Sequence, residues 1–426
     1  MIATGFNRAA LAGVTAGMAA TFLGVGLARF AYTAILPELI QQEWFSEAEA
    51  AYLGAANLIG YAAGALLAVP VARRLGTVAI VLACGFLVVL SFIACAWPIA
   101  FSPYLIARAI SGLCGAALMV LVPSAALTAL QPGQRAKGAS LVFTGVGLGI
   151  LISATMVPLL AHDNLSHAWL ALTATGALAL WLLTRTFAAA IEAPGGPAPA
   201  RLQTPPTTVP VSPWLIASVA LAYAMDAIGF VPHTLFWVDY LQRELGLSVG
   251  ASALHWGLFG VGAMCGPFVI ARLGRQFGWH TLLVGALAVK GGAVLLPLVN
   301  ANVVSLALSS VLVGALVPGL VAIVSGRMSE LATATGHARL WGLATATFAC
   351  AQGLAAALFA WFYDNVDNGA NLIFAIGGGA LLAGALIAES FHRRHAVRAV
   401  EFPDGVPARR NASSTCVTTY RNRGQQ

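Results

Sequence analysis

Twelve long apolar segments dominate the sequence, and this feature limits the possible folds more than any other. They lie near residues 9–37, 49–71, 77–97, 103–130, 138–160, 167–188, 213–241, 250–271, 280–299, 303–326, 340–362 and 371–391. About 20 apolar residues in an α-helix are long enough to cross the hydrocarbon layer of a membrane. Only 9% of the residues are charged, whereas a soluble domain contains about 25%. The sequence therefore predicts an all-α integral membrane protein with twelve transmembrane helices.

The composition also excludes several other classes of protein. The 45 glycines suit membrane helices that pack closely, since small residues let backbones approach one another. The net charge of +7 comes from cations scattered over short loops and the C-terminal segment, without the clustered basic face of a nucleic-acid-binding protein. The six cysteines show neither a disulfide framework nor the spacing of a metal site. We expect no nucleic-acid partner, no cofactor and no metal.

The distribution of positive charges predicts the orientation of the chain. Short loops that carry Lys and Arg are retained in the cytoplasm. With the N-terminus inside, Arg243 is the external cation among the 22 Lys and Arg residues, Arg29, Arg108 and Lys290 lie within spans, and the other 18 are cytoplasmic. The external loops instead collect acids, among them Glu38, Glu43, Glu47, Glu49, Asp163, Asp239, Glu244, Asp364 and Asp367. We expect a multi-pass protein of a bacterial inner membrane with both termini in the cytoplasm.

The two halves of the chain repeat one another. A shift of 202 residues superposes Ser46 on Ser248, Gly60 on Gly262, Gly64 on Gly266, Arg73 on Arg275, Gly76 on Gly278 and Gly112 on Gly314. In the first span, a shift of 201 matches Thr33 to Thr234, Glu38 to Asp239 and Gln41 to Gln242. This pattern predicts two pseudo-symmetric six-helix bundles, with a substrate site between them near the middle of the membrane.

The repeat also suggests the domain boundaries. Residues 193–212 are rich in proline, which cannot continue a helix, and we interpret them as a cytoplasmic linker; a plain long loop is the alternative. The predicted organisation is an N-terminal bundle over 1–192, this linker, a C-terminal bundle over 213–391 and a disordered cytoplasmic tail over 392–426.

Four segments resemble the major facilitator superfamily (MFS), and the resemblance extends from the first span to the last. GALLAVPVARRLG after the second span is similar to a degenerate form of the cytoplasmic Gly-xxx-Asp-Arg-xx-Gly-Arg-Arg motif, without its acidic member. RAISGLCG in the fourth span is similar to the Arg-xxx-Gly signature of that helix, and GLARFAYTAILP with AANLIGYAAGAL resembles the YbfB/YjiJ-like branch. The resemblance implies a single-chain transporter driven by an ion gradient, and a conformational role for Arg73, Arg74, Arg108 and Arg275.

Arg29 is the clearest candidate for substrate binding. A charge inside a membrane is costly, so it marks either a ligand or a partner within the protein. Beside Phe30, Tyr32 and Thr33, Arg29 can offer paired donors to a carboxylate or phosphate. The alternative is structural, with Arg29 paired to Asp226 or Glu38.

Asp226 is the carboxylate that the sequence places well inside a span, and we predict that it couples transport to protons. Burial raises a carboxylate pKa and a nearby cation lowers it; a permanent pair with Arg29 would not titrate. His233 and Trp237 follow on roughly the same stripe of the helix, and both are predicted to face the substrate. His255 opens the next span and is a second proton-coupling candidate. Histidines that merely hydrogen-bond near the outer interface are the alternative.

Other polar residues in the spans have two interpretations. Asn57, Tyr61 and Gln352 can bind substrate or join the second span to the eleventh, and Tyr32 and Thr33 complete the predicted binding set. Arg108 lies near an outer helix end where it can snorkel to the interface. For Lys290 we expect a snorkelling or lipid-contacting side chain.

These observations predict a monomeric secondary transporter that moves a small organic solute by alternating access, with protons as the coupling ion. A transport-inactive membrane sensor or scaffold is the alternative. The segment GVGLGI at 145–150 lies in an apolar helix without a preceding strand, so it does not predict a nucleotide site. We expect no enzymatic activity.

Overall fold

The computed structural model describes residues 6–128, 130–191, 213–331 and 337–401. These residues contain twelve helical spans long and apolar enough to cross a membrane, and no strand occurs in this part of the chain. The predicted all-α fold of twelve spans in two bundles is confirmed. The predicted linker 193–212 lies outside the described residues, as does the part of the predicted tail beyond Glu401.

The first bundle contains six spans. Its helices are α1 (Arg8–Thr21), the π-helical η1 (Phe22–Phe30) and α2 (Ala31–Gln41), which together form one span, followed by α3 (Glu47–Leu75), α4 (Thr77–Ala94), α5 (Phe101–Thr128), the short 3₁₀ turn η2 (Pro132–Gln134), α6 (Arg135–Leu160) and α7 (Leu165–Ile191).

The second bundle repeats this order. Its first span joins α8 (Pro213–Val231), η3 (Pro232–Phe236), α9 (Trp237–Asp239) and η4 (Tyr240–Glu244), and it is followed by α10 (Val249–Phe277), α11 (Trp279–Val299), α12 (Val303–Leu331), α13 (His337–Asn365) and α14 (Gly369–Glu401). The last helix thus continues ten residues beyond the predicted end of its span at residue 391.

Each repeated residue has the same structural task in both bundles. The hydroxyl groups of Ser46 and Ser248 cap the N-termini of α3 and α10 by accepting bonds from Glu49 N and Ala251 N. Gly76 and Gly278 end the same two helices with φ of 91° and 74°, a backbone region that favours glycine. The sequence repeat is therefore a repeat of helix caps and turns.

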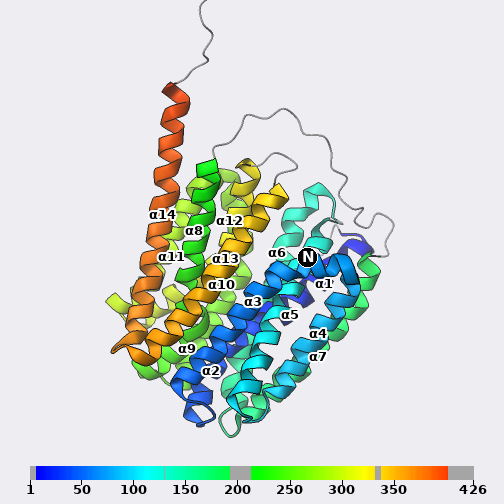
Figure 1. The fold of residues 1–426 in the computed structure, drawn as a ribbon, viewed down its shortest axis with the longest axis vertical. Helices are drawn as coiled ribbons and strands as arrows, with labels where there is room; N and C mark the ends of the chain where they lie inside the picture. Colours follow the sequence, from blue (N-terminus) through cyan, green and yellow to red (C-terminus); the bar gives the residue numbers. More distant parts are fainter. Residues whose placement is uncertain (1–5, 129, 192–212, 332–336, 402–426) are drawn as a thin grey trace, which may run out of the picture.

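The bundles face each other through a central set of helices. In Figure 1, α4 and α7 lie at one edge of the molecule and α11 and α14 at the other. Between the bundles, α3 packs against α13 and α6 against α10. Residues of these inner faces are buried, whereas large apolar side chains of the outer helices are exposed, as lipid-facing surfaces require.

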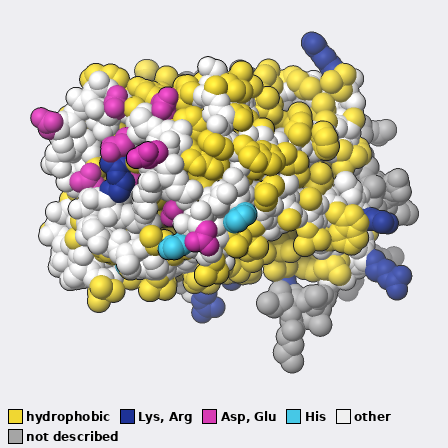
Figure 2. Space-filling model, turned by 90° about the horizontal axis from the view of Figure 1, so that it is seen from below, with side chains coloured by type: hydrophobic (Ala, Val, Ile, Leu, Met, Phe, Trp, Pro, Cys, Tyr) yellow, Lys and Arg dark blue, Asp and Glu magenta, His cyan; other side chains and the backbone are white. Residues whose placement is uncertain are grey.

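The two ends of the bundles differ in charge. We call the end with the α2–α3 and α6–α7 turns the acidic end, because Glu43, Glu47, Glu49 and Asp163 lie there. The opposite, basic end carries Arg73, Arg74, Arg135, Arg272 and Arg275. In Figure 2, acidic side chains gather toward one end of the visible face, and apolar side chains cover most of the remainder.

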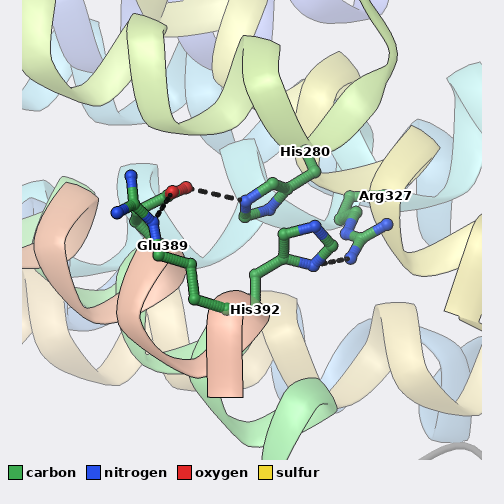
Figure 3. A network of polar contacts seen from close by, with 5 residues as sticks. His280, Arg327, Glu389 and His392 are labelled. Carbon is green, nitrogen blue, oxygen red and sulfur yellow. Dashed lines mark hydrogen bonds and ion pairs between the residues drawn. The ribbon is translucent and has the colours of Figure 1, made fainter. Parts of the chain in front are cut away.

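A polar cluster at the basic end connects α14 to α11 and α12 (Figure 3). His280 of α11 lies 3.1 Å from Glu389 of α14, and the rings of His280 and His392 have centroids 3.7 Å apart. Arg327 of α12 donates to Nδ1 of His392 at 3.5 Å. An arginine has no acceptor atom, so Nδ1 of His392 must be unprotonated in this contact. The cluster fixes the last span against its neighbours.

Candidate functional site

Arg29 lies in η1, near the middle of the first span, and is 7% exposed. Its guanidinium donates to Oε1 of Gln352 in the other bundle at 3.1 Å. The same group lies 5.2 Å from the ring centroids of Phe30 and Tyr61 and 4.8 Å from that of Phe230. Neither alternative carboxylate partner is present, because none of the described ion pairs includes Arg29, and its Nε has no hydrogen-bond partner. Among the described residues, three aromatic rings and one amide hold this cation.

Arg108 is a second buried cation close to Arg29. It is 2% exposed, donates to Ala28 O at 3.1 Å, and lies 4.3 Å from the ring centroid of Tyr32. The expectation that Arg108 snorkels to the interface is therefore wrong. Its position on the inner face of α5 turns the side chain toward η1 instead of toward the helix end.

Both arginines line one small cavity between the bundles. Its other lining residues are Tyr32, Gly54, Asn57, Leu58, Thr234 and Leu235. With a volume of about 10 Å³, the cavity is far smaller than the several hundred Å³ of a typical ligand pocket. The structure thus shows the bundles closed around this point, and an organic solute can enter only if they separate.

The predicted polar residues around the cavity have unequal freedom to bind a ligand. The hydroxyl of Tyr32 donates to Ala50 O at 2.7 Å, and that of Thr33 to Thr234 O at 2.5 Å. Asn57 donates to Ala28 O and Arg108 O, so it joins helices of the first bundle and not, as the alternative had it, the second span to the eleventh. Its Oδ1 has no partner, nor does Nε2 of Gln352.

Asp226 pairs with Lys290. Oδ1 of Asp226 on α8 lies 2.6 Å from Nζ of Lys290 on α11, and both residues are almost fully buried. The expectation of a snorkelling Lys290 is wrong, and so is the pairing of Asp226 with Arg29. Because α11 lies at the edge of the bundle, the sequence favoured a lipid-facing lysine, but position 290 is on the face that packs against α8. The ring of Phe230 lies beside both this pair and Arg29, since its centroid is 5.3 Å from Nζ of Lys290 and 4.8 Å from the guanidinium of Arg29.

His233 and Trp237 are next to each other, as predicted, with ring centroids 4.3 Å apart. Their polar atoms bond to α12: Nε2 of His233 lies 2.8 Å from Ser309 Oγ, and Nε1 of Trp237 donates to Ser310 Oγ. These contacts keep His233 and Trp237 within the second bundle.

His255 on α10 is buried, and its Nδ1 has no hydrogen-bond partner. The three predicted arginines Arg73, Arg74 and Arg275 are exposed at the basic end.

Two carboxylates that the sequence analysis counts with the external loops are buried within the spans. Glu38 in α2 is 6% exposed and Asp239 in α9 is 0% exposed. The sequence signal was present, since the shift of 201 matches these two acids to each other. The first span continues beyond its predicted end, to Gln41, and so includes Glu38. Asp239 lies inside the predicted span 213–241 and is buried near the acidic end of that span.

Comparisons with known proteins agree with this geometry. A family model described as "Uncharacterised MFS-type transporter YbfB" matches residues 21–389. A gallate transporter of Pseudomonas putida is 28% identical, and the match covers 67% of this chain and 69% of that protein. The solved structure of a D-xylose-proton symporter superposes with a TM-score of 0.70 at 16% identity, over 90% of this chain and 97% of that one. A peptide transporter superposes with a TM-score of 0.71 at 16% identity, covering 92% and 96%.

Proposed function

The chain belongs to the MFS family represented by the transporter YbfB, and from this membership we propose that it moves a small organic anion across the membrane by alternating access. Proteins of this family are transporters and not enzymes. The observation that supports an anionic solute is Arg29, a buried cation between the bundles without a carboxylate partner among the described residues. A buried charge requires compensation, and a bound anion supplies it.

The surroundings of Arg29 favour an anion that also carries a ring. Phe30, Tyr61 and Phe230 lie around the guanidinium, and aromatic faces bind planar groups by stacking. The unpartnered Nε of Arg29 and Nε2 of Gln352 are donors available to a carboxylate, while Oδ1 of Asn57 is an acceptor. The gallate transporter among the relatives is consistent with this choice of solute.

We assign proton coupling to Asp226 within its pair with Lys290. Protonation of Asp226 would leave Lys290 as an unpaired cation close to the Phe230 ring, and thus close to Arg29. The binding of a negative solute at Arg29 and the protonation of Asp226 would then affect each other electrostatically, because both cations lie next to the ring of Phe230. In this proposal His255 remains a second candidate, Arg108 and the exposed Arg73, Arg74 and Arg275 act in the conformational change, and the protein functions as a monomer.

The direction of insertion follows from the charges at the two ends. The basic end is assigned to the cytoplasm of a bacterial inner membrane and the acidic end to the outside, because cationic loops are retained inside. In the described state the bundles touch from the middle of the spans to the acidic end, through Arg29 and Gln352, Trp256 and Ser153, and Gln41 and Gln242. This state is closed toward the outside.

A ligand screen of the purified protein tests the proposed solute. A solute that binds the folded state alone raises apparent stability, by about 2.7 kcal/mol at one hundred times its Kd. We expect aromatic and other organic acids to raise the melting temperature, and neutral sugars and organic cations to leave it unchanged. Arg29→Gln should fold and lose this response, whereas Arg272→Gln, at an exposed position of the basic end, should retain it. Stabilisation by sugars or cations alone would refute an anionic solute.

A further inference from the structure

The acidic ends of the first and seventh spans meet on the pseudo-twofold axis. Thr33 contacts Thr234, and Gln41 donates to Gln242 at 2.9 Å. In both contacts the partners differ by 201 residues, the same shift that relates the two halves. Equivalent residues related by a twofold axis can touch each other only at the axis. The closed outer end is therefore centred on this contact.

In the part of the chain that the structure describes, one ion pair crosses the same interface. Arg243 at the end of η4 pairs with Glu47, the first residue of α3 in the other bundle. The side chains of Arg243 and Glu47 are 25% and 49% exposed. Exposed ion pairs contribute little to stability when they stand alone, so this pair needs a further contact that holds Arg243 in place.

Asp239 provides that contact from beneath. It is 0% exposed, and its Oδ1 lies 3.7 Å from a guanidinium nitrogen of Arg243, one helical turn away. Oδ2 accepts a hydrogen bond from the hydroxyl of Tyr363 on α13, and Oδ1 has no hydrogen-bond partner. The ionised groups that face this carboxylate are Arg243, Glu47 and Glu244. Two carboxylates thus pair with one cation, with Glu244 close to the buried one, and that buried carboxylate has the least solvent to stabilise its charge.

We propose that Asp239 is the proton-binding site of an outer gate, and that its ionised form holds Arg243 across the interface against Glu47. When a proton from the external water binds Oδ1, Asp239 becomes neutral and no longer attracts Arg243. The cation then keeps Glu47 alone, a half-exposed partner, and the outer ends separate. The π-helical backbone of η3 and η4 around Asp239 fits this role, since such segments are frequent at functional sites.

The inference rests on the proposed alternating-access function, but its test needs neither a solute nor transport. Spin labels at Asp163→Cys and Ala301→Cys, exposed turns of the two bundles at the acidic end, report their separation in a background without native cysteines. At alkaline pH we expect a single short distance. At acidic pH a longer distance should appear beside it, because Asp239 is then neutral.

Variants separate the role of Asp239 from a general effect of pH. Asp239→Asn should show the longer distance at every pH, and Asp239→Glu should keep the pH response. Arg243→Gln gives a second readout if Asp239→Asn folds poorly, and it should also open the gate at every pH. Asp364→Asn, an exposed acid of the same end, should behave as the unmodified protein. An Asp239→Asn variant with the unmodified pH response would overturn the proposal, as would a distance that does not change with pH.

The proposed outer gate at Asp239 and the proposed organic anion at Arg29 can be refuted independently of each other. A gate that responds to Asp239 in a protein that binds no organic anion would leave the gate intact and remove the proposed solute. Binding of an anion that depends on Arg29, in a protein whose outer distance ignores Asp239, would do the reverse.

Discussion

The buried charges of the spans differ in whether the protein itself neutralises them. Lys290 and Asp226 neutralise each other at 2.6 Å, whereas Arg29 and Arg108 contact rings, an amide and a carbonyl. Removing one partner of a buried ion pair leaves the other charge uncompensated. Replacing Arg29 leaves no carboxylate unpaired, because none is paired with it among the described residues, and removes only the proposed binding of the solute. Single substitutions of Lys290 or Asp226 should therefore mainly lower stability, whereas substitution of Arg29 should mainly abolish transport.

For Arg29 we expect Arg29→Ala to abolish transport and Arg29→Lys to restore little of it. Lysine keeps the positive charge but lacks the planar pair of donors that binds a carboxylate. The measurement is uptake of the solute found by the ligand screen into proteoliposomes, normalised to the amount of folded protein. Arg272→Ala serves as the matched control and should transport normally. Full activity of Arg29→Ala would remove this residue from the binding site.

For the Asp226–Lys290 pair, we expect Lys290→Met to destabilise the protein by about 3–5 kcal/mol, because it strands a buried carboxylate. Asp226→Asn should destabilise by a similar amount, and the double variant by much less than the sum, since neither charge remains. Thermal unfolding in detergent measures all three. Additive effects in this cycle would show that the two residues do not interact.

The double variant also tests coupling. If protonation of Asp226 drives accumulation, Asp226→Asn with Lys290→Met should exchange solute across the membrane and fail to concentrate it when a proton gradient is imposed. The amide keeps the size of the carboxyl group but cannot titrate in this range. Proton-driven accumulation by the folded double variant would exclude a coupling role for the pair.

At the scale of helices, each bundle contains the same glycine-lined crossing. Gly60, Gly64 and Gly112 bring α3 against α5, and Gly262, Gly266 and Gly314 bring α10 against α12. A Cβ at Gly112 would overlap the carbonyl oxygen of Asn57, and one at Gly314 that of Phe259, the equivalent residue 202 positions later. Backbone meets backbone at these points, as small residues allow in membrane helices.

The crossing predicts that Gly112→Ala lowers stability by about 1–3 kcal/mol, the usual cost of overpacking. Gly292→Ala on α11 is the control, because nothing lies within 4 Å of a Cβ there, and it should be neutral or slightly stabilising. Thermal unfolding of the two purified variants makes the comparison. Equal melting temperatures would mean that α3 and α5 can move apart at this crossing without a loss of stability.

At the scale of the whole molecule, the orientation can be tested without knowledge of the solute. We expect a reporter fused after Arg201 to be cytoplasmic and one inserted near Glu47 to be periplasmic, because cationic loops stay inside. Alkaline phosphatase and green fluorescent protein fusions report opposite sides. Reversed signals would invert the assignment of the acidic and basic ends, and with it the side on which the gate of Asp239 opens.

The sequence by itself determined the number of spans, the order of the two bundles and the repeated positions at which the structure has helix caps and turns. These features depend on local properties: apolar length, the caps at Ser46 and Ser248, and the left-handed turns at Gly76 and Gly278. The sequence also identified Arg29 and Asp226 as residues that need an explanation, since charge within a span is visible without coordinates.

Only the tertiary structure decided which charges meet. Lys290 pairs with Asp226 across 64 residues, and Arg243 pairs with Glu47 across the two bundles. Glu38 and Asp239 are buried because their helices extend and pack at the closed end. An ion pair depends on the face that each helix turns inward, and a uniformly apolar membrane helix has too weak a polar side to reveal that face from its sequence.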